Sequence, residues 1–350
     1  MIRLKVAILY QLTPPPIIKG IVKPMKEGGY SDSGADIALA LQQKNIDLII
    51  PVNSPRIENN FDWVFPDSYD GIESAIKKGA NTFWLNTVLH SKHSILKFTN
   101  QSLLVVGQEP KQVEIFDDKF YTNNLLRGQS LPIPISHLLT ANNDIPIGFP
   151  MVLKPVRGRG SQGVVLVHNE RELREEFTKL ITSKKYGKKA IIETFLPGKE
   201  ITITIMPPGN YIIRNERVEK KSHWSLPPVE RFNHIEGIVP YNGVIAVVNN
   251  SKKIPNNNES IKELNEISKW CELAGKIIGA RAPIRIDCRK NSVGVYQIFD
   301  LNMKPNMTGA SRPHRKDQDS LTMIAATGVG WGYSDLIFNI LSQYWALDSL

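Results

Sequence analysis

Apolar and polar positions follow two patterns along the first hundred residues. Short apolar runs are separated by segments whose apolar residues recur every three or four positions, the spacing of one helix face. A Pro- and Gly-rich stretch at residues 14–29 predicts a loop. Strands that alternate with helices favour βαβ units on a parallel sheet, so we expect an α/β domain over residues 1–105. Strands are predicted at residues 4–10, 47–52, 82–85 and 103–106, and helices at residues 33–44 and 69–78.

The next stretch, residues 106–188, combines both patterns and predicts an α+β unit. A loop rich in Gly and Arg separates its two central strands. The expected elements are a helix at residues 117–127, strands at residues 151–156 and 163–168, and a helix at residues 170–183.

A third unit is predicted over residues 189–350. Residues 215–243 within it are polar and show little periodicity. A loop of that length in a compact protein is usually a functional lid or a disordered segment. The expected elements are strands at residues 190–195, 201–206, 211–214, 283–289 and 293–302, a helix at residues 259–278 and two C-terminal helices.

The composition excludes several classes of protein. Of 350 residues, 41% are apolar and 22% are charged, which excludes a disordered, collagenous or coiled-coil chain. No apolar run approaches the roughly 18 residues of a membrane span. The N-terminal apolar run has no small-residue cleavage site, which argues against a signal peptide. Cys271 and Cys288 cannot form a disulfide framework, and we expect both to be buried in a cytoplasmic protein.

The chain carries 43 basic and 34 acidic residues, a net charge of +9. Because the basic residues are scattered rather than gathered in a stripe, we predict no nucleic-acid partner. The excess is compatible with solvated surface or with an anionic small-molecule substrate. Charge alone does not decide between the two.

A lysine precedes a Gly-rich loop in the stretch MVLKPVRGRGSQGVVLV, residues 151–167. Glycines let backbone N–H groups approach phosphate oxygens, and Lys154 would add a positive charge at the strand end. The stretch is not a Walker A loop, because no Lys-Ser/Thr pair follows the last glycine. A Gly-rich β-hairpin turn is the alternative interpretation.

Two carboxylates flank a turn in the stretch IIETFLPGKEITIT, residues 191–204. Glu200 after the turn is placed to accept hydrogen bonds from ribose hydroxyls, and the backbone of residues 193–196 is placed to face an adenine edge. Two surface carboxylates beside a turn, Glu193 and Glu200, are the alternative.

Polar residues gather on the last two predicted strands. Asp300 and Asn302 lie two positions apart and therefore share a face, while Asp287 ends the preceding strand. Two carboxylates and an amide from adjacent strands make a site of hard oxygen ligands suited to Mg²⁺. The alternative is a polar strand end in which Asp287 pairs with Arg285 or Arg289.

The order of these motifs resembles the ATP-grasp superfamily: a lysine strand, a Gly-rich loop, Glu-x6-Glu, Arg-x-Asp and Asp-x-Asn. Asp118-Lys119, followed by Leu131-Pro132, resembles the start of the central subdomain in the D-alanine–D-alanine ligase branch. The resemblance covers residues 105–315. The branch's Asn-x-x-Pro-Gly-Met-Thr segment and the serine after it are matched by Pro305, Met307, Thr308 and Ser311.

The resemblance implies a three-subdomain fold, α/β and α+β, in which residues 1–105 are a Rossmann-like pre-ATP-grasp domain. Residues 106–188 would be the central subdomain and residues 189–350 the catalytic one. Lys119 and Lys154 would hold ATP phosphates under a lid of Ser161, Gln162 and Gly163. The adenosine pocket would comprise Glu193, Phe195, Leu196 and Glu200. Asp287, Asp300 and Asn302 would bind two Mg²⁺ ions, with Mn²⁺ as an alternative. The implied catalytic residues are Arg285, Ser161, Asn306, Ser311 and Lys220.

The activity that the resemblance implies is ATP-dependent joining of a carboxylate to an amine through an acylphosphate. Amino-acid-like small molecules would be the substrates, with a homodimer as a candidate assembly and no membrane partner. Positioning and charge neutralisation suffice for phosphoryl transfer, so lysines, arginine and metal ions can carry it.

The chain departs from the family pattern at several positions. Asp300 stands where the family has glutamate, and Asn306 where it has glycine. Lys220-Lys221 is the counterpart that we consider for the Lys-Tyr pair of the family's substrate lid. The basic and aromatic residues of segment 215–243, together with Lys304 and Arg312, predict a substrate more acidic or larger than D-alanine. In that segment these residues are Arg217, Lys220, Lys221, His223, Trp224, Arg231 and His234. The alternatives are D-alanine–D-alanine ligation itself and a nucleotide-binding protein that has lost catalysis.

Overall fold

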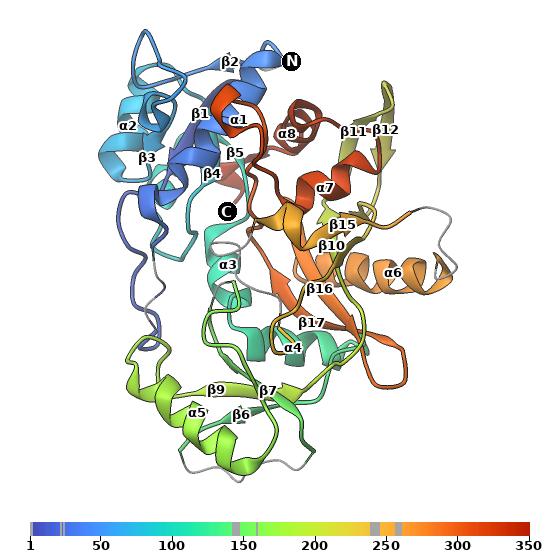
Figure 1. Ribbon diagram of the computed structural model, residues 1–350. Helices are drawn as coiled ribbons and strands as arrows, with labels where there is room; N and C mark the ends of the chain where they lie inside the picture. The colour runs from blue at the N-terminus through green and yellow to red at the C-terminus, as the bar shows by residue number, and fades with distance from the viewer. Residues whose placement is uncertain are drawn as a thin grey trace.

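The computed structural model describes residues 3–21, 23, 25–141, 148–158, 160–238, 246–255 and 261–350. Three sheets and a separate hairpin lie within these residues (Figure 1). No helix in the described part of the chain is both long and apolar enough to cross a bilayer.

The first sheet confirms the predicted α/β class for the N-terminal part. Its strands run in the order β18-β5-β4-β1-β2, with β3 also paired to β1, and the pairs among β1 to β5 are parallel. The short 3-10 helix η1 (Glu27–Tyr30) leads into α1. The elements are β1 (Lys5–Tyr10), α1 (Ser31–Gln43), β2 (Asp47–Leu48), β3 (Phe65–Pro66), α2 (Tyr69–Lys77), β4 (Thr82–Asn86) and β5 (Leu104–Val106).

A four-stranded antiparallel sheet, in the order β6-β9-β7-β8, forms the central part. Leu173 and Phe177 of α5 pack against its strands. The helix predicted from residue 117 begins at Lys119, because the Asp118 side chain caps it by accepting the Tyr121 N–H at 3.1 Å. The elements are α3 (Pro110–Phe116), α4 (Lys119–Gly128), β6 (Ser136–Leu139), β7 (Met151–Pro155), β8 (Val165–Val167), α5 (Glu170–Thr182) and β9 (Ala190–Thr194).

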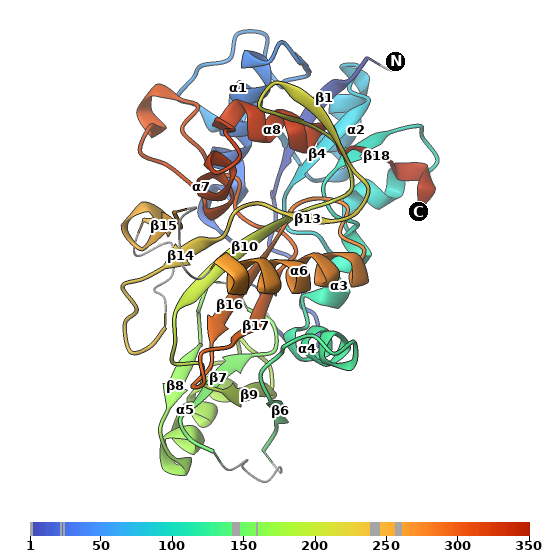
Figure 2. The same ribbon diagram turned by 90° about the vertical axis from the view of Figure 1, so that its right-hand side faces the viewer.

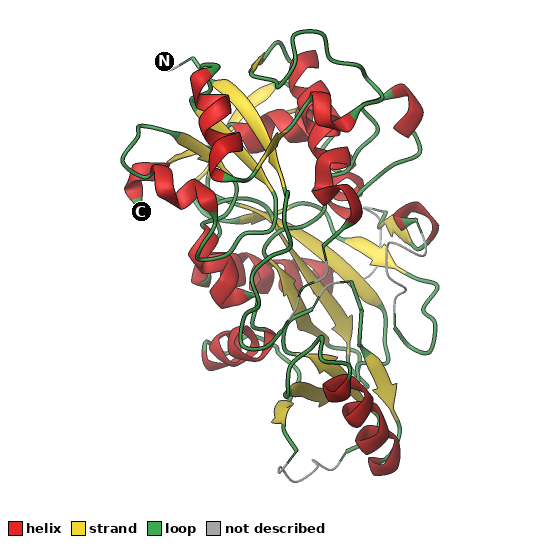
Figure 3. Cartoon of the chain, turned by 90° about the vertical axis from the view of Figure 1, so that its left-hand side faces the viewer, coloured by secondary structure: helices red, strands yellow, loops and turns green. Residues whose placement is uncertain are grey.

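The third sheet is antiparallel, in the order β15-β14-β10-β16-β17, and β13 pairs with β10. One face is apolar and packs against α6, which lies across it in Figure 2. Figure 3, from the opposite side, shows the other face. The start predicted for this helix, residue 259, lies outside the described residues. The elements are β10 (Glu200–Met206), β13 (Trp224–Ser225), β14 (Val229–Arg231), β15 (Ser251–Lys253), α6 (Ile261–Ile277), β16 (Ile284–Lys290) and β17 (Tyr296–Asn302).

The prediction of one irregular segment over residues 215–243 is wrong for its first half. Residues 209–220 form the hairpin of β11 (Gly209–Ile213) and β12 (Glu216–Lys220). Trp224 is buried after it, against Tyr211 and Trp331. The hairpin's outward positions are polar, which concealed its period-two pattern. Residues 232–238 are largely irregular, and residues 239–243 lie outside the described residues.

The end of the chain returns to the first sheet. Two helices, α7 (Leu321–Thr327) and α8 (Tyr333–Leu341), precede β18 (Trp345–Ala346), which pairs antiparallel with β5. Helix α8 packs against α1 (Figure 1). The boundaries at residues 105 and 188 stay a prediction, and this return crosses the first of them.

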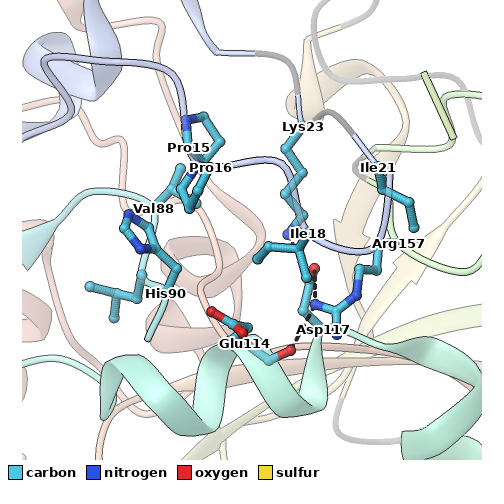
Figure 4. A pocket seen from close by; sticks show the side chains of 11 residues that line it. Pro15, Pro16, Ile18, Ile21, Lys23, Val88, His90, Glu114, Asp117 and Arg157 are labelled. Atoms are coloured by element: carbon cyan, nitrogen blue, oxygen red, sulfur yellow. Dashed lines mark hydrogen bonds and ion pairs between the residues drawn. The ribbon is translucent and has the colours of Figure 1, made fainter. Parts of the chain in front are cut away.

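The connection from β1 to η1 is the predicted loop, and it reaches the central sheet (Figure 1). Ile21 forms a β-bridge with Tyr186 and is buried against Val156 and Ile191. Beside it lies a small cavity of about 20 Å³ (Figure 4). The cavity is lined by Pro15, Pro16, Ile18, Ile21, Lys23, Val88, Leu89, His90, Glu114, Asp117 and Arg157.

His90, in the wall of this cavity, should make the protein sensitive to mild acid. Burial, with a smaller contribution from His93, lowers its pKa from 6.5 to about 4. Between these pH values the unfolded chain binds a proton that the folded chain does not, so stability falls as pH drops from 6.5 toward 4. We expect His90→Asn to recover on the order of 1 kcal/mol of unfolding free energy at pH 5, after allowance for partial exposure. Urea unfolding at pH 5 and pH 8 measures this, and an equal effect at both pH values would contradict it.

Candidate active site

The strand register builds one polar face on the third sheet. Directly opposed residues on antiparallel strands share a face. Thr202 of β10 opposes Asp287 of β16, which opposes Asp300 of β17. We define the polar face by Glu200, Thr202, Thr204, Arg231, Arg285, Asp287, Arg289, Asp300 and Asn302.

A β-bulge puts Asp300 on this face. Cys288 opposes Ile298, but Asp287 opposes Asp300, so Phe299 is the extra residue. In regular register Asp300 would oppose Ile286 and enter the apolar face, since a one-residue slip reverses every side chain. The bulge also frees the Phe299 carbonyl for another partner.

Two lysines from the central part meet this polar face. Lys119, at the start of α4, forms an ion pair with Asp300. Lys154, on β7, donates to the Phe299 carbonyl at 2.9 Å and to Glu193 Oε1 at 2.6 Å. The structure therefore brings together Lys119, Lys154, Glu193 and Asp300, which lie far apart in the sequence.

These buried charged groups shift one another's pKa values. Burial raises the pKa of Asp300, but Lys119, Lys154 and Arg285 outweigh it, so the net shift is downward. Asp300 in turn holds the pKa of Lys119 above its usual value, against the effect of burial. Burial raises the pKa of Glu193, and Lys154 offsets this only in part. Asp300 is therefore a carboxylate at neutral pH, and Lys119 is its cationic partner.

The predicted metal ligands lie together, and Asp287 and Asn302 accept hydrogen bonds from other residues of the protein. Asp287 accepts from Arg285 at 3.1 and 3.0 Å and from the Thr202 hydroxyl at 2.5 Å. Asn302 Oδ1 accepts the Lys304 N–H at 3.0 Å. No group of three or more His, Cys, Asp and Glu residues suited to a metal occurs in the described ranges. Two carboxylates and an amide fit Mg²⁺ that also binds phosphate, because Mg²⁺ seldom uses an all-protein cage.

The end of β9 has an unused acceptor suited to a nucleobase. Glu193 is buried, and its Oε2 has no hydrogen-bond partner among the described residues. An amino group such as that of adenine would satisfy it. Leu196 is buried nearby in the chain, and the guanidinium of Arg289 stacks on the Phe195 ring at 5.1 Å. These residues fit the adenosine pocket implied by the sequence.

The segment after β14 covers Glu200. The His234 ring nitrogen lies 2.9 Å from Glu200 Oε2, and Arg289 Nη1 donates to the Gly237 carbonyl at 2.5 Å. The sequence assigns neither Arg289 nor His234 to the site. Their signal is positional: Arg289 lies four residues after Arg285 and therefore on the same strand face.

The Gly-rich turn lies between β7 and β8. Ser161 and Gly163 have φ values of 61° and 71°. A Cβ at Gly163 would lie 3.0 Å from Pro155 and 3.1 Å from Tyr186, so glycine is required there. Ser161 is exposed and Gln162 is half-buried.

Asn306, Ser311 and Lys220 make contacts other than those the family pattern implies. Asn306 does not adopt a positive φ, and its Oδ1 accepts from the Thr308 N–H and hydroxyl at 3.2 and 2.9 Å. Ser311 donates to the Asp36 carbonyl at 2.9 Å. Lys220 lies over the Trp224 ring at 4.8 Å, on the β11–β12 hairpin, and is not brought together with the polar face.

Arg312 does not face the site, contrary to the sequence interpretation. It is fully buried and its Nε donates to Asp36 Oδ1 at 2.8 Å. Its other nitrogens donate to Asn60 and to the Asp32 carbonyl, and Arg315 also pairs with Asp36. This buried cluster fastens the loop after β17 to α1.

A fold of this kind, with two antiparallel sheets facing across lysines and carboxylates, is the ATP-grasp fold. The structure of D-alanine–D-alanine ligase from Bacillus anthracis complexed with ATP matches it with a TM-score of 0.65 at 17% identity, covering 97% of each chain. The family model for the D-ala D-ala ligase C-terminus matches residues 136–342, more than half of the chain. The chain therefore belongs to this family.

Two relatives show how far this sequence differs from those of named D-alanine–D-alanine ligases. D-alanine–D-alanine ligase B of Chromobacterium violaceum is 28% identical over 229 residues, which are 64% of this chain and 66% of the relative. D-alanine–D-alanine ligase A of Bacillus cereus is 26% identical over 298 residues, 82% of this chain and 88% of the relative. The chain thus spans about two thirds of the length of the first relative.

The Lys119–Asp300 pair should show strong energetic coupling. In a double-mutant cycle with Lys119→Met and Asp300→Asn, each single change leaves an uncompensated, partly buried charge. We expect a coupling energy of about 1–3 kcal/mol by urea unfolding. The exposed pair Lys179–Glu176 on α5 is the control, with about 0.5 kcal/mol or less. Equal coupling in the two pairs would show that burial does not strengthen the first.

Removal of Arg312 should destabilise the protein. Among the described residues, Arg312→Met leaves the buried Asp36 carboxylate with Arg315 as its one ion-pair partner. We expect a loss of about 3 kcal/mol of unfolding free energy. Arg56→Met, which removes an exposed arginine paired with Asp62 at 3.6 Å, is the matched control and should cost less than about 1 kcal/mol. Losses of similar size would disprove the proposed role of the buried cluster.

Proposed function

We propose that this protein is an ATP- and Mg²⁺-dependent ligase that joins the carboxylate of one amino acid to the amine of another. The observation that carries the proposal is the convergence of Lys119 and Lys154 on the carboxylate end of β17. Two cations and two carboxylates between facing sheets are suited to a triphosphate with its metal ions. Membership of the D-ala D-ala ligase C-terminus family supports it.

Several residues of the polar face, and the two lysines that meet it, have tasks in this reaction. The attacking carboxylate oxygen forms a bond to the γ-phosphorus of ATP, the bond to ADP breaks, and an acylphosphate results. The amine then attacks the acyl carbon, phosphate leaves, and the amine loses a proton. Lys119, Lys154 and Arg285 offset the negative charge that develops on the phosphoryl oxygens. Mg²⁺, held by Asp287, Asp300 and Asn302, would neutralise phosphate charge further.

D-alanine is the substrate we propose, with D-alanyl-D-alanine as the product. The expectation of a larger or more acidic substrate rests in part on Arg312, whose guanidinium forms a buried ion pair with Asp36. It rests also on Lys220 and Lys221 in a lid, and Lys220 lies on a hairpin beside Trp224. The names of the relatives support D-alanine.

The proposal is tested by ADP release from Mg²⁺-ATP in the presence of D-alanine, with product identified by mass spectrometry. We expect D-alanyl-D-alanine from the wild type. Asp300→Asn should lower turnover about 100-fold or more, because it removes a charge that balances the metal ions. Lys179→Ala, an exposed change on α5, is the control and should keep wild-type turnover.

Other outcomes would revise or reject the proposal. ADP release with another D- or L-amino acid, but not with D-alanine, would retain the ligase and change its substrate. ATP binding without ADP release, across all D- and L-amino acids singly and in pairs, would indicate a nucleotide-binding protein without catalysis. Unchanged turnover in Asp300→Asn would place the metal ions elsewhere.

A further inference from the structure

Arg231 is a buried cation on the polar face that the predicted site does not include. It ends β14 and directly opposes Glu200 of β10, so both side chains lie on the same face. Arg289 opposes Glu200 from the other side, on β16. Only 7% of the surface of Arg231 is exposed.

Arg231 lacks the partners that the other arginines of this face have. Its Nε has no hydrogen-bond partner among the described residues, and none of their carboxylates lies within ion-pair distance of its guanidinium. By contrast, Arg285 is held by Asp287, and Arg289 by backbone carbonyls. Burial lowers the pKa of Arg231, and the charges of Asp287 and Glu200 offset this only in part.

An unpaired buried guanidinium is unfavourable unless an anion completes it. The nearby carboxylates are already committed, because Asp287 accepts from Arg285 and Thr202, and Glu200 lies at the His234 ring. The guanidinium fork matches the oxygens of a phosphoryl or carboxylate group. The structure therefore contains a preformed cation for an oxyanion that none of the described residues supplies.

The segment that follows Arg231 brings no cation of its own. Residues 232–245 contain neither lysine nor arginine. In the described part of this segment, residues 232–238, His234 contacts Glu200 and the Gly237 carbonyl accepts from Arg289. Positive charge on this side of the polar face therefore comes from the strand, where backbone pairing fixes it.

We propose that Arg231 binds an oxygen of the phosphoryl group that is transferred from ATP. This inference rests on the proposed function. A substrate carboxylate is a second source of the same oxyanion chemistry, and the experiment separates the two. Because a strand carries Arg231, the charge is in place before any ligand arrives.

The test is Arg231→Met with Arg231→Lys as the charge-conserving partner. Titration calorimetry gives the affinities for ATP and ADP in Mg²⁺, and thermal unfolding gives the stability of the ligand-free protein. For Arg231→Met we expect ATP affinity to fall about 10-fold or more, since hydrogen bonds to charged groups are strong. ADP affinity should change less than about twofold, and the melting temperature should rise, because an unpaired buried charge has been removed.

Arg231→Lys should recover part of the ATP affinity. Arg217→Met, at an exposed position of β12, is the control and should alter neither affinity nor melting temperature. Unchanged ATP affinity with a raised KM for D-alanine would assign the oxyanion to the substrate carboxylate. The proposal is overturned if the ligand-free Arg231→Met protein melts at a lower temperature, if both nucleotides weaken equally, or if no affinity and no KM changes. Wild-type protein that binds neither nucleotide would instead reject the proposed function.

Discussion

The constraint on which the structure depends is the neutralisation of buried charge between two facing sheets. Lys154 and Glu193 lie at most 5% exposed, and Lys119 and Asp300 are mostly buried beside them. Each lysine would be costly without its carboxylate, and each carboxylate without its lysine. In the ligand-free protein the charges satisfy one another. In the function that we propose, a bound triphosphate with its metal ions would exchange these partners: the lysines would pair with phosphate and the carboxylates with the metal ions.

A single extra residue makes this arrangement possible. The strands β16 and β17 must be apolar toward α6 and charged on the other face. Strict alternation would place Asp300 on the apolar face, away from Asp287. The bulge at Phe299 corrects the alternation and turns one carbonyl toward Lys154. The same local irregularity therefore supplies both a carboxylate and a backbone acceptor, which is typical of bulges beside functional sites.

The sequence predicted the parts of the site whose chemistry is local. Lys154, Glu193 and Asp300 were identified by their order along the chain, and the structure brings them together. Arg231 was read only as one of several basic residues in the polar segment, since its importance arises from strand pairing and burial. Arg312 was misplaced for a related reason: a charged residue in a polar stretch is usually on the surface, and only the fold reveals Asp36 beside it. Two-residue strands such as β3 and β13 are too short for a period-two pattern to emerge.

The N-terminal part is tied to both sides of the site, but by contacts of unequal strength. Ile21 joins it to the central sheet by packing in a small apolar cluster. Burial of an isoleucine side chain contributes about 1.5–3 kcal/mol of stability. Arg312 joins it to the loop after β17 through a buried ion pair, whose rupture costs about 3–5 kcal/mol. If the two sheets separate, we therefore expect the contact of Ile21 with the central sheet to break before the buried pair of Arg312 and Asp36. In that case the central part would move, while α1, the loop after β17 and the polar face would stay together.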